Sequence, residues 1–344
     1  MSDALVAAVV LGATALSFVT GFHDAPNAIT TTIITSTLPR RAALAFAALL
    51  NLLGALLSVS LVVSVAAPIM TVMDLPDFLA GADGRLGVVL LAALATGIGW
   101  NILTWWWAMP SSSWHAMLSA LIGGMLGAGF GWVEPRLIGL FVLPILASPV
   151  LGFILSYLIT RLIGLMAVKR IGRTRDLRAA QTVSAGAVAL AHGISNGRLP
   201  VGIALTAIAA WQGSSPAEQA LQPGPLLIGS AAAMALALGL GTFAGGARIM
   251  RTLGRRLTDL TTPQGLAAET STALILYLMA YGFHAPVSSS QLVTSSIAGS
   301  AVAVSLRQVN WRLFGTIMLI WLVTPVVCAG ASAVLALGLL QIGL

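Results

Sequence analysis

The stretch "PSSSWHAMLSALIGG", residues 110–124, returns 176 positions later as "PVSSSQLVTSSIAGS", residues 286–300. The two copies share a proline and two serines, in the pairs Pro110 with Pro286, Ser112 with Ser288 and Ser113 with Ser289. A proline followed by serines is typical of the first turn of a helix, so each copy predicts a helix start.

A second pair of motifs has nearly the same spacing. "GFHDAPNA" at 21–28 faces "GISNGRLP" at 193–200, 172 positions later, which places Asp24 opposite Asn196. Two motifs repeated at one offset predict a chain built from two copies of one structural unit.

The composition is that of a membrane protein. Of 344 residues, 58% are hydrophobic and 8% are charged, and the mean hydropathy is +0.97. A soluble domain has about 25% charged residues, so the lipid bilayer is the expected solvent. The single cysteine, Cys328, excludes an intrachain disulfide and a cysteine-clustered metal site. The Met-Ser-Asp start lacks a basic region, so we expect the first apolar run to be a retained membrane helix.

Ten apolar segments are long enough to cross the bilayer. They fall near residues 3–20, 42–68, 86–108, 115–133, 138–160, 181–211, 226–247, 264–282, 291–306 and 312–341. The last is long enough to contain two spans. The net charge of +7 lies in short basic clusters between segments, which favours cytoplasmic turns over nucleic-acid binding. These clusters are Arg40 with Arg41, residues 161–178, residues 248–256, and Arg307 with Arg312.

Basic turns on the inside fix the expected topology. The N-terminus lies outside a plasma membrane, the linker at 161–178 is cytoplasmic after five crossings, and the acidic connections at 74–83 and around Glu218 lie outside. An odd number of spans per half makes the halves run in opposite directions. We therefore expect an all-α polytopic membrane protein with two inverted-topology repeats of about five spans each, with broken or re-entrant helices. The repeats are 1–165 and 181–344, and a basic linker at 166–180 joins them.

The repeated motifs combine helix breakers with hydroxyl and amide side chains. Proline and glycine free backbone groups, which is tolerated at membrane depth where those groups line a cavity enclosed by protein. The N-terminus of a broken helix carries partial positive charge and open N–H groups, which suit an anion. The two serine turns therefore predict an oxyanion site. Ordinary helix caps at the membrane ends are the alternative interpretation.

Asp24 is the strongest single candidate for a functional residue. A carboxylate within a span costs about 2.5–3.5 kcal/mol, so it normally faces an ion, a proton path or a partner. Asn27 lies one helical turn further on and adds an amide oxygen, which makes a hard-cation or proton site. Glu269 is a second carboxylate inside an apolar segment, with either a functional or a structural role.

All four histidines lie in or beside the motifs: His23, His115, His192 and His284. The chain has no HExxH pattern and no Cys/His spacing, so a metal site is the less favoured interpretation of this clustering.

At these residues the chain resembles the inorganic phosphate transporter family of secondary carriers. "GFHDAPNA" and "AHGISNG" stand where that family has a "GxNDxANA"-like motif and an "HGxND" motif, and "PSSSWH" and "PVSSSQ" stand where it has "PVSTTH"-like turns. "WNILTWW" and "PQGLAAET" also resemble stretches of its bacterial members. The resemblance covers nearly the whole chain.

The resemblance implies a phosphate carrier coupled to sodium ions or protons, with its site between two inverted repeats and with a homodimer as the assembly. It implies a substrate role for Asn27, Asn196, Arg198, Ser112, Ser113, Ser288, Ser289 and Ser290. It implies a coupling-ion role for His23, Asp24, Asn27, Asn196 and Glu269, with a sodium ion expected at Asp24 and Asn196. It implies no further cofactor.

The departures from the family pattern have consequences. Ser195 and Asn196 replace the expected Asn-Asp, and Arg198 follows, so the site is more positive by up to two charges. We expect either a reduced coupling stoichiometry or an ion site that relies on Asp24 and Glu269 alone. His23 replaces an asparagine, and histidine is the side chain best suited to exchange protons at physiological pH, which favours protons slightly. Gln291 replaces the histidine of the second turn.

Three alternatives stay open from the sequence. A sulfate permease on the same scaffold would use the same hydroxyl-rich turns, although phosphate can also donate a proton to Asp24. A membrane enzyme, such as a metal-dependent hydrolase using the histidines and Asp24, lacks a readable ligand motif. A channel without coupled transport fits the duplication less well than a carrier does.

Overall fold

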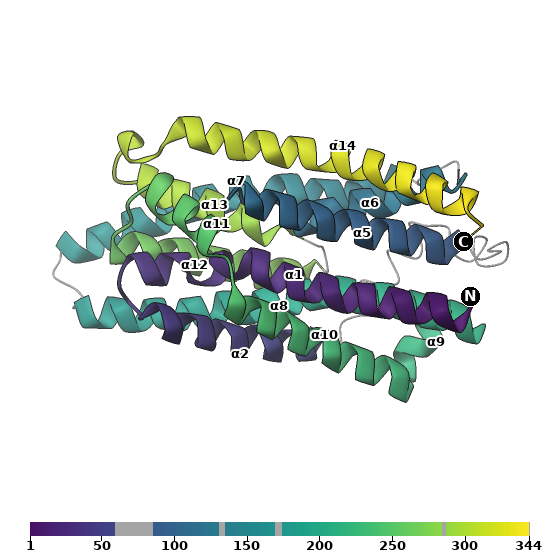
Figure 1. Cartoon of the computed structure of the whole chain (residues 1–344). Helices are drawn as coiled ribbons and strands as arrows, with labels where there is room; N and C mark the ends of the chain where they lie inside the picture. Colours follow the sequence, from purple (N-terminus) through teal and green to yellow (C-terminus); the bar gives the residue numbers. More distant parts are fainter. Residues whose placement is uncertain (59–84, 131–134, 169–173, 284–286, 344) are drawn as a thin grey trace.

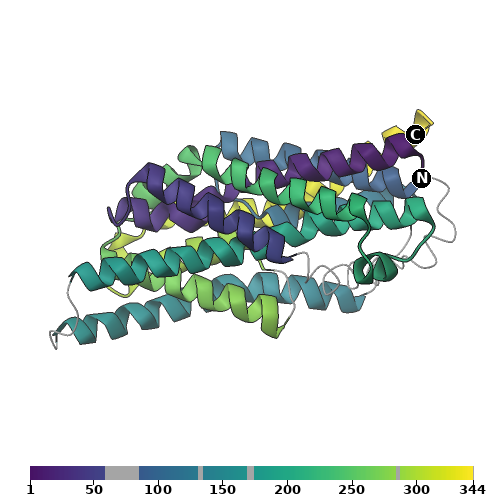
Figure 2. The ribbon, with the colours of Figure 1, turned by 90° about the horizontal axis from the view of Figure 1, so that it is seen from below.

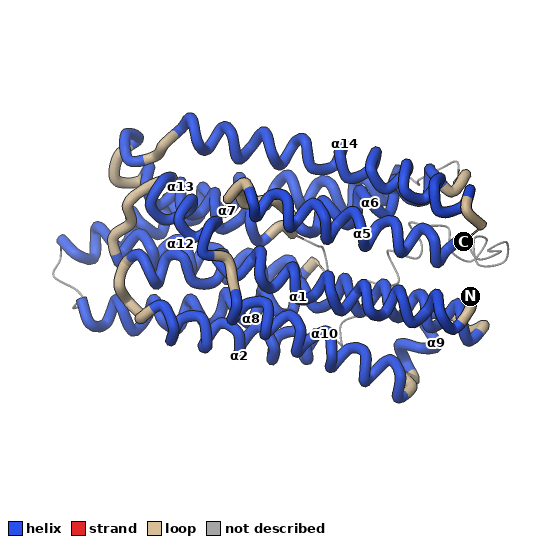
Figure 3. The backbone as a smooth tube through the Cα atoms, in the orientation of Figure 1, coloured by secondary structure: helices blue, strands red, loops and turns tan. Residues whose placement is uncertain are grey.

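The computed structural model describes residues 1–58, 85–130, 135–168, 174–283 and 287–343. Every regular element in these ranges is a helix, and the helices run along the long axis of an elongated bundle (Figures 1, 2 and 3). The α-helices are α1 (Asp3–Ile34), α2 (Arg40–Ser58), α5 (Arg85–Trp106), α6 (Ser113–Gly127), α7 (Pro135–Val168), α8 (Thr174–Gln212), α9 (Pro216–Leu221), α10 (Pro225–Ala244), α11 (Ala247–Arg251), α12 (Thr262–Tyr277), α13 (Ser289–Val302) and α14 (Trp311–Gln341). The π-helices η2 (Thr252–Arg256) and η3 (Leu278–Gly282) extend α11 and α12, and η4 (Leu306–Gln308) is a short 3₁₀ turn.

Six of the described helices are long and apolar enough to cross a membrane. They are Asp3–Ile34, Arg40–Ser58, Arg85–Trp106, Leu146–Met166 within α7, Pro225–Ala244 and Trp311–Gln341. The helix α8 has 39 residues, but the polar stretch 192–198 interrupts its apolar sequence. The expected all-helical, multi-pass fold is confirmed.

Residues 312–341, which are long enough for two spans, form a single span. The helix α14 is one continuous helix of 31 residues, and Pro325 lies inside it without ending it. A helix of that length is about 46 Å long, so it crosses the roughly 30 Å hydrocarbon core once and extends beyond it. The first span is also longer than expected, because α1 continues through the polar motif at 21–28 to Ile34.

Short helices begin at both serine turns. The helices α6 and α13 have 15 and 14 residues, so each is only about 22 Å long and too short to span the bilayer. In Figure 1 α6 lies toward the end of the bundle that holds the termini, and α13 lies toward the other end. Two positions from the sequence analysis, His284 and Pro286, lie outside the described residues.

Helices of the two halves pack against each other in matching pairs. The helix α1 packs against α10, and α2 packs against α8. The short helix α6 packs against α14, and α13 packs against α7. The starts of α6 and α13, and of α7 and α14, are each 176 residues apart. Each half therefore completes the packing of the other, and the first and second halves of the chain form one interlocked bundle.

The basic turns and the termini lie at opposite ends of the bundle. The α1–α2 turn, the end of α7 and the start of α8 lie at the end away from both termini (Figure 1). The acidic connection at 74–83 and part of the basic linker lie outside the described residues. Glu218 lies in α9 on the side of the termini, where its carboxylate accepts the backbone N–H of Ser215 at 2.9 Å. That hydrogen bond lowers the pKa of the Glu218 carboxyl.

Glycine allows α2 and α8 to approach closely. A Cβ added to Gly54 would lie 2.2 Å from the carbonyl oxygen of Leu190, and one added to Gly193 would lie 2.3 Å from that of Asn51. Backbone cannot yield as the end of a flexible side chain does, so both positions require glycine.

We predict that Gly54→Ala destabilises the protein by about 1–3 kcal/mol, because the added methyl group forces α2 away from α8. Gly202→Ala in α8 is the matched control, since nothing lies within 4 Å of its added Cβ. The thermal midpoint of the detergent-solubilised variants measures the effect. Equal midpoints for the two variants would contradict the close packing.

Candidate functional site

Pro26 marks the centre of the site on α1. Proline has no N–H to donate to the carbonyl of Phe22, and the backbone N–H of Gly246 donates to that carbonyl instead, at 3.0 Å. Gly246 has a φ of +45°, and an added Cβ there would lie 2.3 Å from Pro26 Cδ. The Gly245-Gly246 loop before α11 is thus fitted against the proline turn of α1.

The Asp24 carboxylate, which is 2% exposed, joins the two serine turns. Its Oδ2 accepts from the hydroxyl of Ser113 at 3.2 Å, and its Oδ1 accepts from the hydroxyl of Ser290 at 3.1 Å. Ser113 begins α6, and Ser290 is the second residue of α13. One carboxylate therefore bonds to residues 89 and 266 positions away, and it places the starts of both short helices beside the middle of α1.

His23, the neighbour of Asp24 on α1, links the same carboxylate to α5. Its Nδ1 lies 2.7 Å from Asp24 Oδ1, and since a carboxylate only accepts, Nδ1 carries the hydrogen. Its Nε2 lies 3.1 Å from the hydroxyl of Thr104 and 3.4 Å from that of Ser111. Both ring nitrogens are hydrogen-bonded, so the ring holds Asp24 in one orientation.

The serines before the short helices act as caps. The hydroxyl of Ser112 accepts from the backbone N–H of His115 at 3.2 Å, and that of Ser288 accepts from Gln291 at 3.3 Å. A capping hydroxyl still has its own hydrogen to donate. The side chains of His115 and Gln291 meet at 3.3 Å, so the starts of the two helices lie beside each other.

Asn27 completes the group on α1. Its amide donates to the hydroxyl of Ser290 at 2.9 Å and to that of Ser289 at 3.4 Å. Its oxygen Oδ1 is buried and has no hydrogen-bond partner in the structure. A buried acceptor without a donor is a ligand atom available to a cation or to the proton of a bound molecule.

His192 approaches Asp24 from α8. Its Nε2 lies 3.7 Å from Asp24 Oδ2, too long for a hydrogen bond, while its Nδ1 lies 3.0 Å from the side-chain oxygen of Asn51. The amide of Asn51 in turn donates to the hydroxyl of Thr242 at 2.9 Å. Asn51 on α2 therefore holds His192 against the site.

Glu269 forms a separate buried group with Thr31. Its Oε1 accepts from the hydroxyl of Thr31, and its Oε2 is buried without a partner. Thr31 is seven residues after Asp24 on α1, which is about 10 Å along the helix toward the basic end of the bundle. The two carboxylates thus lie at successive depths along one face of α1.

The second-half residues Asn196 and Arg198 are buried but do not bond to Asp24. Asn196 Nδ2 has no partner, and Arg198 Nη2 donates to the carbonyl of Ala280 in η3 at 3.3 Å. Arg198 is 3% exposed, and no carboxylate in the described part of the chain forms an ion pair with it. The structure thus unites the first-half residues with both serine turns and leaves Arg198 beside η3.

A metal-dependent hydrolase has no ligand set in the described residues. They contain no group of three or more histidine, cysteine, aspartate or glutamate side chains suited to a metal ion. His284, the fourth histidine of that alternative, lies outside them.

Sequence reasoning did not single out four polar partners: Asn51, Thr104 and Ser111 around Asp24, and Thr31 beside Glu269. It gave His192 a role only in the metal-site alternative. Asn51 and Thr104 are polar residues inside apolar segments, and Ser111 lies inside the repeated motif itself. A search for isolated amides and hydroxyls in predicted spans would have found them.

We predict that Asn51→Leu destabilises the protein by about 1–3 kcal/mol, because it leaves His192 Nδ1 and the Thr242 hydroxyl without that partner in a buried site. Thr206→Val is the control, since the hydroxyl of Thr206 bonds only to the carbonyl of Gly202 in its own helix. Thermal midpoints in detergent measure both. If Asn51→Leu lowered the thermal midpoint less than Thr206→Val does, the role of Asn51 in holding His192 would be contradicted.

Known proteins are similar to this chain in sequence and in fold. A sequence model described as "Phosphate transporter family" matches the chain twice, over residues 20–176 and 166–332. A "Probable low-affinity inorganic phosphate transporter" of Mycobacterium bovis is 34% identical over 328 residues, 93% of this chain and 74% of that protein. A protein of the same description from Bacillus subtilis is 29% identical over 95% of this chain and 94% of its own length. A solved structure titled "The sodium-dependent phosphate transporter" matches with a TM-score of 0.78 at 20% identity, over 99% of this chain and 100% of that one, which shows the same fold.

Proposed function

Because this chain belongs to the phosphate transporter family, we propose that it is a secondary carrier that imports inorganic phosphate through a site between α1, α6 and α13. The family resemblance expected from the motifs is confirmed, and the family is one of transporters, not enzymes. The observation that carries the proposal is the Asp24 carboxylate, bound at once by Ser113 and Ser290.

The serine turns suit a tetrahedral oxyanion. Two helix N-termini meet at one point and offer backbone N–H groups, partial positive charge and the hydroxyls of Ser112, Ser113, Ser288, Ser289 and Ser290. In the structure the carboxylate of Asp24 takes the hydrogens of two of these hydroxyls, as an anion would. Phosphate must compete with Asp24 for the same donors, so the two negative charges need a cation or a shared proton between them.

The residues around Asp24 fit such a cation. A carboxylate and the partnerless Oδ1 of Asn27 are hard oxygen ligands, which suit sodium. The name of the matched structure, "The sodium-dependent phosphate transporter", supports sodium as the coupling ion. His23, bonded to Asp24, supports the proton as the alternative. Asn196 and Glu269 are the further coupling-ion candidates, with Asn196 as a second sodium ligand.

Several observations support two inverted repeats at 1–165 and 181–344, joined by the basic linker at 166–180. The family match covers each half separately, and matching helices pack in reciprocal pairs. The termini lie at one end, and the end of α7 and the start of α8 lie at the other, as an odd number of crossings in each half requires (Figure 1). The carrier then alternates access by moving one repeat against the other around Asp24.

The orientation and assembly follow from the same proposal. The basic turns gather at one end, which we assign to the cytoplasmic side of the plasma membrane, with the N-terminus outside. A homodimer, implied by the family resemblance, stays a prediction.

Arg198 supplies a fixed positive charge in the second half. Its guanidinium is buried without a carboxylate partner among the described residues, and it lies two residues after Asn196, where the family has an aspartate. A buried unpaired cation attracts an anion passing nearby. We propose that Arg198 attracts phosphate and that its positive charge reduces the number of coupling cations that transport needs.

The sulfate permease has no support from the relatives, whose names refer to phosphate. Phosphate also fits Asp24 better, because a protonated phosphate can donate to this carboxylate whereas sulfate has no proton to donate.

We predict that the purified protein in proteoliposomes takes up labelled phosphate when a sodium gradient is imposed, and that excess unlabelled sulfate does not suppress it. Uptake driven only by a proton gradient would identify the proton as the coupling ion and would leave the assignment as a phosphate carrier unchanged. Counterflow of labelled against unlabelled phosphate distinguishes a carrier from a channel. Suppression by sulfate, or labelled sulfate entry without phosphate entry, would overturn the substrate assignment.

We predict that Asp24→Asn lowers gradient-driven phosphate uptake by about 30-fold or more, because it removes the charge that a coupling ion neutralises. The control is Asp3→Asn in the same helix, an exposed residue that can still accept from Trp211 Nε1. Initial uptake rates at equal protein incorporation measure the effect. Unchanged uptake in Asp24→Asn would refute the role of this carboxylate.

We predict that Asn196→Asp makes uptake depend more steeply on sodium concentration or pH, because it restores a buried negative charge opposite Asp24 in the repeat. Asn310→Asp is the control, since an aspartate still caps α14 there. The slope of uptake rate against ion concentration is measured for both. An Asn196→Asp slope equal to that of the wild type would sink the reduced-coupling hypothesis.

A further inference from the structure

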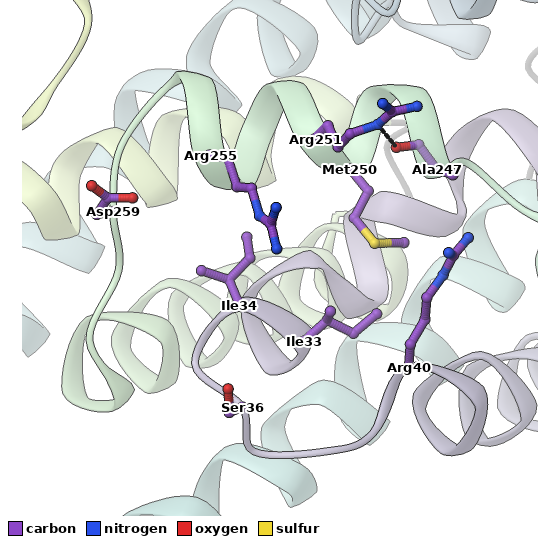
Figure 4. A pocket seen from close by; sticks show the side chains of 10 residues that line it. Ile33, Ile34, Ser36, Arg40, Ala247, Met250, Arg251, Arg255 and Asp259 are labelled. Carbon is purple, nitrogen blue, oxygen red and sulfur yellow. Dashed lines mark hydrogen bonds between the residues drawn. The ribbon is translucent and has the colours of Figure 1, made fainter.

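A cavity of about 620 Å³ lies between the end of α1, the start of α2 and the α11–η2 segment (Figure 4). Its apolar floor includes Ile33, Ile34 and Met250. By the position of the α1–α2 turn, it lies at the basic end of the bundle, away from the termini (Figure 1). It does not include the residues of the Asp24 site.

Three arginines line this cavity: Arg40, Arg251 and Arg255. In Figure 4 the guanidinium group of Arg255 points toward Ile34, and that of Arg40 lies on the other side of the Met250 side chain. Arg251 Nε donates to the carbonyl of Ala247 at 3.4 Å, so this arginine is held at the rim. No carboxylate among the described residues forms an ion pair with any of the three.

The surroundings keep the cavity positive. Asp259 is the one acidic lining residue, and in Figure 4 it lies across the cavity from Arg40. Arg40 is the first residue of α2, whose N-terminus adds partial positive charge. A second cavity of about 360 Å³ shares Arg251 and is also lined by Arg248 and Arg256.

The segment that carries these arginines is fitted directly to the helix of the Asp24 site. Gly246, which precedes α11, donates to Phe22 O beside Pro26. Gly254, in η2, packs so closely on α1 that an added Cβ would lie 1.5 Å from Ile34 Cδ1 and 2.9 Å from Thr30 Cγ2. A ligand that bridges Arg40 and Arg255 would therefore tie η2 to α2 across the end of α1.

We propose that this cavity binds a phosphate group at the cytoplasmic end, supplied either by free inorganic phosphate or by the headgroup of an anionic phospholipid. Guanidinium groups recognise phosphate oxygens through paired N–H donors, and three unpaired arginines around one space favour a multiply hydrogen-bonded anion. The proposal rests on the proposed function for its cytoplasmic orientation only, because binding is measured without transport.

The test uses the full-length protein in nanodiscs of phosphatidylcholine, in a Ser113→Ala/Ser290→Ala background that removes two hydroxyl donors of the transport site. We expect labelled inorganic phosphate to bind, and Arg40→Gln/Arg255→Gln to weaken this binding about tenfold or more. The control pair Arg307→Gln/Arg312→Gln removes two exposed charges outside the cavity and leaves binding unchanged. Equal thermal midpoints show that all variants fold.

A second arm tests the lipid source by native mass spectrometry of protein purified from membranes that contain phosphatidylglycerol. Retention of this lipid that is lost in Arg40→Gln/Arg255→Gln, but not in the control pair, supports a headgroup site. If the arginine pair changes neither phosphate binding nor lipid retention relative to the control pair, the proposal is overturned. A failure of phosphate uptake in proteoliposomes would concern the transport site alone and would leave this result standing.

Discussion

The structure depends on one buried carboxylate. Asp24 carries a negative charge in the middle of a membrane bundle, where an unpaired ion is costly, and its stabilisation requires donors from several directions. His23 supplies one, and the hydroxyls of Ser113 and Ser290 supply the others. Because those serines stand at the starts of two different short helices, α6 and α13 must begin beside α1.

The interlocked packing follows from that arrangement. A helix that starts in the middle of the bundle is too short to span the membrane, so α6 and α13 each need a longer helix beside them. That helix comes from the other half of the chain: α14 packs along α6, and α7 packs along α13. Glycines such as Gly54 and Gly193 allow backbones to approach closely where α2 meets α8. Most of the long helices are thus a scaffold, and the chemistry is concentrated where α1, α6, α8 and α13 meet.

Much of this was predictable from the sequence, and the rest was not, for physical reasons. The duplicated Pro-Ser motif predicted where α6 and α13 begin, but not that both are too short to span, and the cost of a carboxylate in lipid singled out Asp24. Neither signal gives the partners across the bundle, because the pairing of Asn51 with His192 depends on how α2 packs against α8. The motif also does not give the hydrogen bond from the Arg198 guanidinium to the carbonyl of Ala280, because the direction of that side chain depends on helix rotation. Whether residues 312–341 form one span or two was left open, because segment length alone does not distinguish one tilted helix from two short ones.

The most direct measurement is an experimental structure of the protein in lipid with saturating phosphate and sodium. The account predicts density for a tetrahedral anion between Ser113 and Ser290, with the hydroxyls of both serines turned from Asp24 toward the anion. It also predicts that Asp24 and Asn27 Oδ1 face the coupling cation. An anion bound elsewhere in the bundle, with the hydrogen bonds from Ser113 and Ser290 to Asp24 intact, would contradict it.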